Sequence, residues 1–356
     1  MNPAYILSSF VSGAKAMHIL LTREFAREYG QRALSIAPAN SQLIYLDPTQ
    51  EALPTELGEA DIAYLSLDLM GGQDAAGAHP RLRVFSRAIE HAPRLRWLHT
   101  QAAGADRPVL QNALRRGVTI TTSSGVTSET VAHTAIAGML ALARGVPDWV
   151  SAQSRKTWRT PPRAQWPRDI NGGKALVVGT GPIGQAIARI LRAMAMHVTG
   201  VRRSRDLLPE FDRMLDFDQS GSALPGVDWI FLACPLTERT FGLVDRDFLA
   251  KLAPHACLIN VARGEVVVDD AVQSALRSGS LGGYYSDVFK DEPLAATSGW
   301  WDTPRTLISP HLAALSRGYG ARAANAFFEN LERYVQGEPL RNVVAAPPAP
   351  GSEKPL

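Results

Sequence analysis

Two series of short apolar segments, each alternating with helix-length amphipathic stretches, constrain the fold of this 356-residue chain more than any other feature. The first series predicts strands at residues 18–21, 42–46, 62–65, 95–99 and 118–121, with helices at 23–34 and 81–92. The second predicts a helix at 182–195 and strands at 175–178, 197–201, 229–233, 257–261, 283–286 and 306–309. Strand–helix alternation is typical of a parallel sheet covered by helices on both faces. We therefore expect an α/β protein with two doubly wound parallel-sheet (Rossmann/flavodoxin-like) domains.

The remaining segments connect or flank these two series. Long helices are expected at 128–143 and 319–336, and the Pro/Trp/Arg-rich connector at 145–171 shows no clear periodicity. Residues 1–16 and the Pro/Ala-rich residues 345–356 are predicted to be disordered tails. Because Met17 directly precedes the first expected strand, residues 1–16 are alternatively a segment that precedes the true start.

Composition restricts the partners and the compartment. The 37 Lys+Arg and 34 Asp+Glu residues leave a net charge of +3 without a basic patch, so we expect no nucleic-acid partner. The longest apolar stretch, at 134–143, is shorter than the roughly 20 residues of a membrane span. Two cysteines, Cys234 and Cys257, cannot form a disulfide framework, and no Cys/His cluster has zinc-ligand spacing. We therefore expect a cytoplasmic protein that binds neither a membrane nor a metal.

A glycine-rich turn follows the first strand of the second series. Gly179, Gly181 and Gly184 match G-x-G-x-x-G between an apolar strand and an amphipathic helix. The first glycine allows a tight turn, the second lets the backbone approach a pyrophosphate, and the third permits close helix–strand packing. The helix N-terminus then faces the phosphates, which predicts a dinucleotide site.

The next strand end indicates which dinucleotide binds. An Asp or Glu about 20 residues after the turn binds the ribose 2′-hydroxyl of NAD. This chain instead has Arg202, Arg203 and Ser204 at that position. Guanidinium groups form charge-assisted bonds with phosphate, which favours NADP(H) over NAD(H). The alternative interpretation is a solvated arginine pair at a strand end.

Three ionisable residues further along the chain suit the reduction of a 2-oxo acid. Arg263 follows an apolar strand, Glu292 precedes a proline, and His311 follows Pro310. Taken singly, they also fit a surface arginine, a turn carboxylate and a helix-capping histidine. Together, the planar arginine suits a substrate carboxylate, the histidine titrates near neutral pH, and the glutamate would stabilise its imidazolium form. His133 is a rival histidine that we interpret as structural, since no such set surrounds it.

These motifs resemble those of the D-isomer-specific 2-hydroxyacid dehydrogenases, in the branch of glyoxylate/hydroxypyruvate reductases. The resemblance runs from about residue 17 to 344 and rests on the glycine turn and four further motifs. Those motifs are Ala-Cys-Pro-Leu-Thr at 233–237, Val-Ala-Arg-Gly at 261–264, Asp-Val-Phe to Glu-Pro-Leu at 287–294, and Pro-His at 310–311. The resemblance implies that Arg263 binds and polarises the substrate, that His311 is the acid/base and that Glu292 pairs with His311.

The resemblance also implies the cofactor and substrate contacts. Ala103 and Gly104 lie in a loop whose backbone N–H groups would cradle the substrate carboxylate. The remaining implied residues contact the cofactor: Pro182 and Ile183 at the pyrophosphate, Pro235 and Thr240 along its cleft, and the Val261 carbonyl and Asp287 at the nicotinamide amide.

The resemblance further implies a discontinuous substrate domain at 17–124 plus 317–344, a dinucleotide-binding domain at 125–316, and an active site in the cleft between them. It suggests a homodimer formed through the cofactor domains. We thus predict NADPH-dependent reduction of glyoxylate or hydroxypyruvate to a D-2-hydroxy acid.

Some features depart from the family pattern, and other functions are possible. Ala132-His133-Thr134 replaces the usual Ala-Glu-His, and Ala314, Leu315 and Ser316 replace a glycine and Ser or Thr after the histidine. One alternative is a family member that acts on a larger 2-oxo acid. Another is a nucleotide-sensing scaffold like the C-terminal-binding corepressors. A further alternative within the same chemistry is oxidation of formate or phosphite. Formate is disfavoured, because formate dehydrogenases of this family have Gln in place of Glu292.

Overall fold

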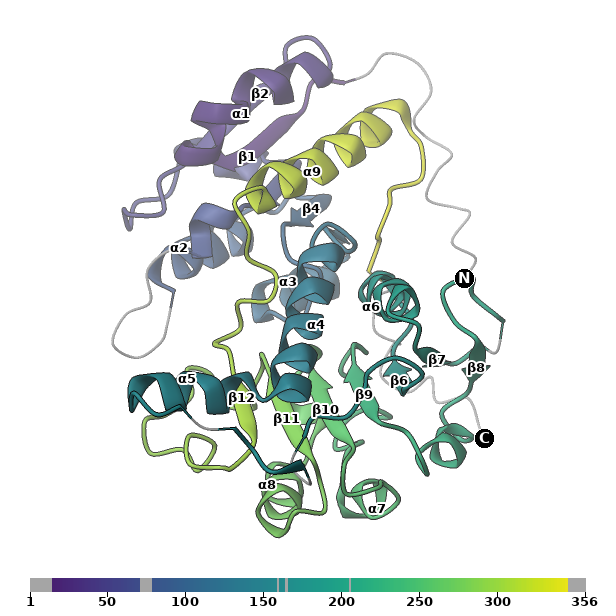
Figure 1. Ribbon diagram of the computed structural model, residues 1–356. Helices are drawn as coiled ribbons and strands as arrows, with labels where there is room; N and C mark the ends of the chain where they lie inside the picture. The colour runs from purple at the N-terminus through teal and green to yellow at the C-terminus, as the bar shows by residue number, and fades with distance from the viewer. Residues whose placement is uncertain (1–14, 71–78, 159, 164–165, 205, 345–356) are drawn as a thin grey trace. The chain divides into compact units, whose positions relative to one another are not determined.

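The computed structural model describes residues 15–70, 79–158, 160–163, 166–204 and 206–344 (Figure 1). The chain divides into two compact units, one comprising Met1–Val126 with Arg317–Leu356 and the other Thr127–Ser316. The predicted disordered tails lie outside the described residues, apart from residues 15 and 16.

The first unit is built on a five-stranded parallel sheet in the order β2-β1-β3-β4-β5. Its strands are β1 (His18–Thr22), β2 (Gln42–Leu46), β3 (Ile62–Leu65), β4 (Trp97–Thr100) and β5 (Thr119–Thr122). Its helices are α1 (Arg23–Ile36), α2 (Pro80–Glu90), α3 (Pro108–Arg115) and α9 (Tyr319–Gln336). The strand order 2-1-3-4-5 is that of flavodoxin-like folds.

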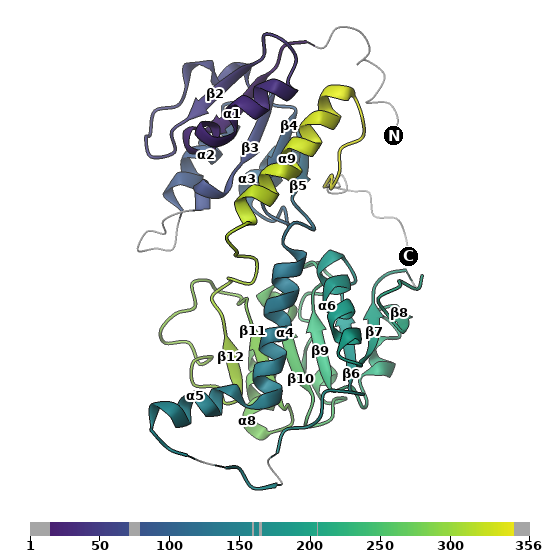
Figure 2. The same cartoon turned by 45° about the horizontal axis from the view of Figure 1, so that its top comes forward.

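Both faces of this sheet are covered, because its strands are apolar on both sides. One face packs against α2 and α3 through residues such as Phe85 and Leu110. The other packs against α1 and α9, where Phe327 stacks on Tyr64 and Trp97. Helix α9 therefore returns from the end of the chain to lie beside α1 (Figure 2).

The second unit contains a seven-stranded parallel sheet in the order β12-β11-β10-β9-β6-β7-β8. The strands are β6 (Lys174–Val178), β7 (His197–Val201), β8 (Arg213–Leu215), β9 (Trp229–Leu232), β10 (Cys257–Asn260), β11 (Gly283–Ser286) and β12 (Thr306–Ile308). The order reverses between β6 and β9, which makes a topological switch point of the Rossmann type.

Helices cover this second sheet on both faces as well. The helices of the unit are α4 (Ser128–Arg144), α5 (Val146–Ser154), α6 (Pro182–Ala193), α7 (Arg246–Leu249) and α8 (Asp269–Ser278). α4 and α6 pack together over one face (Figures 1 and 2). α7 and α8 cover the other. The predicted class of two parallel α/β domains is confirmed.

The structure differs from the sequence-based prediction in its smaller elements. The connector expected to lack periodicity contains α5, whose described residues are not buried. Helices α3, α7 and α8 and strand β8 were not among the expected elements. Among the described residues, no helix is long and apolar enough to cross a membrane.

Candidate active site

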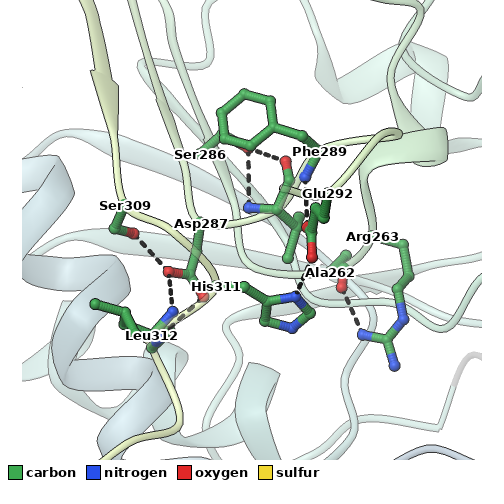
Figure 3. A network of polar contacts seen from close by, with 11 residues as sticks. Ala262, Arg263, Ser286, Asp287, Phe289, Glu292, Ser309, His311 and Leu312 are labelled. Carbon is green, nitrogen blue, oxygen red and sulfur yellow. Dashed lines mark hydrogen bonds and ion pairs between the residues drawn. The ribbon is translucent and has the colours of Figure 1, made fainter. Parts of the chain in front are cut away.

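Three predicted site residues lie in loops at the carboxyl ends of neighbouring strands (Figure 3). Arg263 follows β10, Glu292 follows β11 and His311 follows β12. The three strands run parallel side by side, so their loops emerge at one edge of the sheet, where open α/β sheets bind ligands. The Arg263 and His311 side chains lie on the same side of these loops. The fold thus brings together three residues that are far apart in the sequence.

His311 and Glu292 form an ion pair, with Nδ1 of the imidazole 2.7 Å from Oε2 of the carboxylate. The hydrogen bond to Glu292 raises the pKa of His311 above its ordinary value, although burial acts in the opposite direction. Burial alone would raise the pKa of Glu292, but hydrogen bonds from His311 and from the Phe289 amide outweigh it, and the pKa is lowered. The ion pair therefore favours the protonated form of this half-exposed imidazole, the form that can donate a proton.

The loop that carries Arg263 is held against the loop that carries Glu292. The Glu292 carboxylate accepts a hydrogen bond from Phe289 N at 2.8 Å. A Cβ atom on Gly264 would lie only 2.1 Å from Lys290 N and from Phe289 C. Only glycine allows this approach of two backbones. The contact fixes the distance between the arginine and the glutamate loops.

Asn260 shapes the turn before Arg263. Its side-chain oxygen accepts from Ala262 N at 3.0 Å, and its Nδ2 donates to the Arg263 carbonyl at 3.1 Å. Nη1 of Arg263 donates to the Ala262 carbonyl at 2.7 Å (Figure 3). The side chain of Asn260 is fully buried, so these bonds are shielded from water.

The Asp287 carboxylate binds the turn that contains His311. Oδ1 accepts from Ser309 Oγ at 2.5 Å and from Leu312 N at 2.9 Å, and Oδ2 accepts from Ala313 N at 3.0 Å (Figure 3). The Asp287 carbonyl accepts from His311 N at 2.8 Å. An ionised carboxylate offers about four acceptor positions, and donors among the described residues use three of them.

The glycine-rich turn joins β6 to α6 at the topological switch point. Gly179 has a φ of +94°, and a Cβ on it would lie 2.6 Å from the backbone of Ala233 in the loop after β9. Gly181 precedes the helix, and a Cβ on it would meet nothing within 4 Å. Pro182 and Ile183 begin the helix, whose first N–H groups have no intrahelical acceptor. This open space beside a helix N-terminus fits the pyrophosphate of a dinucleotide.

The residues predicted to bind the rest of the cofactor lie at the ends of β7, β9 and β10. Arg202 and Arg203 follow β7, and neither guanidinium has an ion pair among the described residues. Ser204 donates a hydrogen bond to Asp206. Val261 directly follows β10.

In the loop after β9, Pro235 is exposed and Thr240 is buried. The Thr240 hydroxyl donates to the Pro235 carbonyl at 2.7 Å. Thr240 therefore shapes this loop from within, and Pro235 forms its surface.

Ala103 and Gly104 belong to the first unit, in the loop after β4. Within that loop, Ala102 N donates to Thr100 Oγ1 at 3.2 Å, and the Ala102 carbonyl accepts from Ser123 N at 3.0 Å. Ala103 is exposed. His133, the rival histidine, is exposed on α4. In the part of the chain that the structure describes, no group of three His, Cys, Asp or Glu side chains is arranged to hold a metal ion.

Comparison with known proteins identifies the family. The model of the D-isomer specific 2-hydroxyacid dehydrogenase, NAD binding domain, matches residues 136–313. A glyoxylate reductase from Pyrococcus horikoshii is 30% identical over 261 residues, which are 72% of this chain and 78% of that enzyme.

Two solved structures are also similar. One is a D-isomer specific 2-hydroxyacid dehydrogenase family protein from Aeromonas salmonicida, with a TM-score of 0.76, 27% identity, and coverage of 93% of this chain and 99% of that one. The other is a D-isomer specific 2-hydroxyacid dehydrogenase from Xanthobacter autotrophicus Py2, in complex with NADPH and MES. Its TM-score is 0.72 and its identity 25%, with coverage of 93% of this chain and 98% of that one.

The two parallel α/β units and the glycine-rich turn define a nicotinamide-dependent oxidoreductase. The chain belongs to the D-isomer specific 2-hydroxyacid dehydrogenase family. The resemblance stated from the sequence motifs is thereby confirmed.

Three features of the site were not predicted from the sequence: the hydrogen bonds of Asn260, the close approach of Gly264 and the bond of Ser309 to Asp287. Only Ser309 had a local signal, a hydroxyl next to the Pro-His motif.

Proposed function

We propose that this enzyme reduces small 2-oxo acids of the glyoxylate/hydroxypyruvate type to D-2-hydroxy acids with NADPH. The observation that carries the proposal is the His311–Glu292 pair, with Arg263 on the same side of the loops. Arg263 would bind the substrate carboxylate and polarise its 2-oxo group. His311 would donate its proton to the developing alkoxide, while Glu292 stabilises the imidazolium form before transfer.

The residues of the second unit fit a bound nicotinamide dinucleotide, which supplies the hydride. The α6 N-terminus with Gly179, Gly181 and Gly184 would hold the pyrophosphate, in contact with Pro182 and Ile183. Asp287 has about one acceptor position left for the nicotinamide amide, and the Val261 carbonyl would assist it. Pro235 and Thr240 would form one side of the cofactor site. In the first unit, the backbone of Ala103 and Gly104 would bind the substrate carboxylate.

Initial rates with glyoxylate and hydroxypyruvate, measured by the absorbance of reduced nicotinamide, test the reaction. We expect His311→Ala to lower kcat by about 10²–10⁴-fold, the range for general acid catalysis. His133→Ala is the matched control and should leave kcat unchanged. A His311→Ala enzyme within about threefold of wild type would refute the role of His311.

The preference for NADPH rests on Arg202, Arg203 and Ser204 at the end of β7. Two guanidinium groups and a hydroxyl would bind the 2′-phosphate, and no carboxylate occupies the first three positions after the strand. We expect Arg202→Ala/Arg203→Ala to raise KM for NADPH by about 10- to 100-fold and to leave KM for NADH within about twofold. Arg246→Ala, an exposed arginine on α7, is the control. Equal changes for both cofactors would contradict the assignment.

A larger apolar 2-oxo acid is the second candidate substrate. Leu312 and Leu315 lie one and four residues after His311 and are 47% and 53% exposed, so they offer apolar contact area near the proposed proton donor. Comparison of kcat/KM for glyoxylate with that for branched and aromatic 2-oxo acids separates the two candidates. Cofactor-dependent peptide binding without any turnover would instead support a scaffold function.

We further propose a cytoplasmic homodimer formed through the second unit. Trp149 and Val150 of α5 are 57% and 60% exposed, and Trp158 is 99% exposed, which is unusual for large apolar side chains on a monomer. The buried free thiols of Cys234 and Cys257 suit a reducing compartment. Light scattering of wild type and Trp149→Ser tests the dimer, and cell fractionation tests the compartment. A monomeric wild type would refute the homodimer. Recovery of the protein outside the cytoplasm would refute the cytoplasmic location.

A further inference from the structure

Strand β11 carries two consecutive tyrosines that point to opposite faces of the sheet. Tyr284 packs in the core covered by α7 and α8, and Tyr285 in the core covered by α4 and α6. Alternation of side chains along a strand produces this arrangement. Both rings are buried, and each hydroxyl has its own partner. The Tyr285 hydroxyl reaches the end of β12, where it lies 2.7 Å from Ser309 Oγ.

A chain of hydrogen bonds runs from Tyr285 to the turn that contains His311. Ser309 Oγ donates its one hydrogen to Asp287 Oδ1 at 2.5 Å, so the Tyr285 hydroxyl is the donor to Ser309. Asp287 in turn accepts the backbone N–H groups of Leu312 and Ala313. The hydroxyl pair is thus the side-chain part of the set of donors that holds this carboxylate, beside the two backbone N–H groups.

His311 needs such support because its backbone is left-handed. Its φ is +54°, a conformation that non-glycine residues adopt only when the surrounding structure holds them in it. The bonds from the turn to Asp287 lie on both sides of this residue in the sequence, at Ser309 and at Leu312. If the carboxylate rotated, the turn would relax, and the imidazole would move away from Glu292.

The position of the Tyr285 hydroxyl is itself fixed by packing. A Cβ atom on Gly138 of α4 would lie 2.4 Å from Cγ of the Tyr285 ring, so helix and ring are in direct contact. One turn earlier on the same helix, Thr134 Oγ1 lies 3.4 Å from the Ala313 carbonyl. Two successive turns of α4 thus contact the His311 turn and the tyrosine ring.

We propose that the Tyr285–Ser309 hydroxyl pair is a positioning device that orients the Asp287 carboxylate and so holds His311 beside Glu292. Neither hydroxyl is assigned a contact with substrate or cofactor. The inference rests on the proposed role of His311 as proton donor. The charged groups that act on His311 are Glu292 and Asp287, which favour the imidazolium, and Arg263, which disfavours it.

The test uses Ser309→Ala, Tyr285→Phe and the conservative Ser309→Thr. With cofactor saturating, we expect Ser309→Ala to lower kcat about tenfold and Tyr285→Phe about threefold, because a small misplacement of a proton donor slows transfer. KM for glyoxylate should stay within about twofold, since Arg263 is untouched. Reduction requires protonated His311, so a looser contact with Glu292 moves the alkaline fall of the pH–rate profile to lower pH. Ser309→Thr retains the hydroxyl, so its kcat and the pH of its alkaline fall should be those of wild type.

The matched control is Tyr284→Phe, which removes a buried hydroxyl from the same strand on the opposite face. Its hydroxyl donates to Ser286 Oγ at 3.0 Å and accepts from Asn260 Nδ2 at 3.5 Å. These bonds do not include Asp287 or Ser309, so we expect no shift of the alkaline fall. The double variant Tyr285→Phe/Ser309→Ala should be no slower than Ser309→Ala, because the two hydroxyls act in series. An NMR titration of the His311 imidazole gives the same comparison without turnover.

The outcomes separate the two proposals. Wild-type kcat and an unchanged His311 titration in both Ser309→Ala and Tyr285→Phe would overturn the positioning role, while an inactive His311→Ala would leave the proposed function standing. Activity retained in His311→Ala would instead refute the proposed function. An equal titration shift in Tyr284→Phe would show that any buried hydroxyl of β11 has this effect, and would also overturn the inference.

Discussion

The substitution Gly264→Ala would push apart the two loops that hold Arg263 and Glu292. The added Cβ would lie 2.1 Å from Lys290 N and Phe289 C, and 2.5 Å from Phe289 O. All three are backbone atoms, so no change of rotamer relieves the clash. Ordinary van der Waals contact begins at 3.4 Å, which requires the two backbones to separate by roughly 1 Å.

A displacement of this size at a catalytic residue costs about 100-fold in rate. We therefore expect kcat/KM for glyoxylate to fall about 100-fold in Gly264→Ala, together with a loss of about 1–3 kcal/mol in the free energy of unfolding from overpacking. Steady-state rates at saturating NADPH and urea unfolding measure the two effects.

Gly221→Ala is the matched control in the same unit. The nearest atom to its added Cβ is the flexible end of Lys251, at 3.8 Å, so neither quantity should change. A folded Gly264→Ala enzyme whose kcat/KM stays within about threefold of wild type would refute the argument that this contact sets the arginine–glutamate geometry.

Three further predictions follow from other contacts. Glu292→Gln removes the charge that raises the pKa of His311, so the alkaline fall of the reduction rate should move to lower pH; a pH–rate profile identical to that of wild type would contradict this. In Gly179→Ala, the positive φ and a clash against Ala233 would both disturb the turn. We expect NADPH to bind at least about tenfold more weakly in a fluorescence titration, and unchanged affinity would disprove the close approach. Phe327→Ala should destabilise the first unit by about 3–5 kcal/mol, because Phe327 lies in the core under α1 and α9. Hydrogen exchange should show lost protection of β3 and β4, and full protection would contradict this place of Phe327 in the core.

Long strands and amphipathic helices could be predicted because their apolar pattern reports burial. β2 at Gln42–Leu46 and α9 at Tyr319–Gln336 have the predicted bounds. α5 was not predicted, because it has only nine residues and the few apolar ones, Val146, Trp149 and Val150, are not buried. Its remaining signals were local, namely Gly145 in the left-handed conformation just before it and Pro147 in its first turn.

In the candidate site, too, some residues could be predicted from the sequence and others could not. Arg263, Glu292 and His311 stand in recognisable motifs, so their chemistry could be proposed from residue type and order. The residues that hold these three side chains in place could not be predicted. The approach of Gly264 to Phe289 and the bond from Tyr285 to Ser309 join segments whose distance depends on how the strands are paired.

Strand register explains why these supporting contacts form. Asn260 pairs with Ser286 across β10 and β11, and Ser286 pairs with Ile308 across β11 and β12. Each strand therefore ends at the same level, and the next residues along, among them Asp287 and Ser309, leave the sheet side by side. A slip of one residue in β12 would turn its side chains to the opposite faces and remove the bond from Ser309 to Asp287. The left-handed turn at His311 would then lose the carboxylate that binds it, so the register of a three-residue edge strand is part of the proposed catalytic geometry.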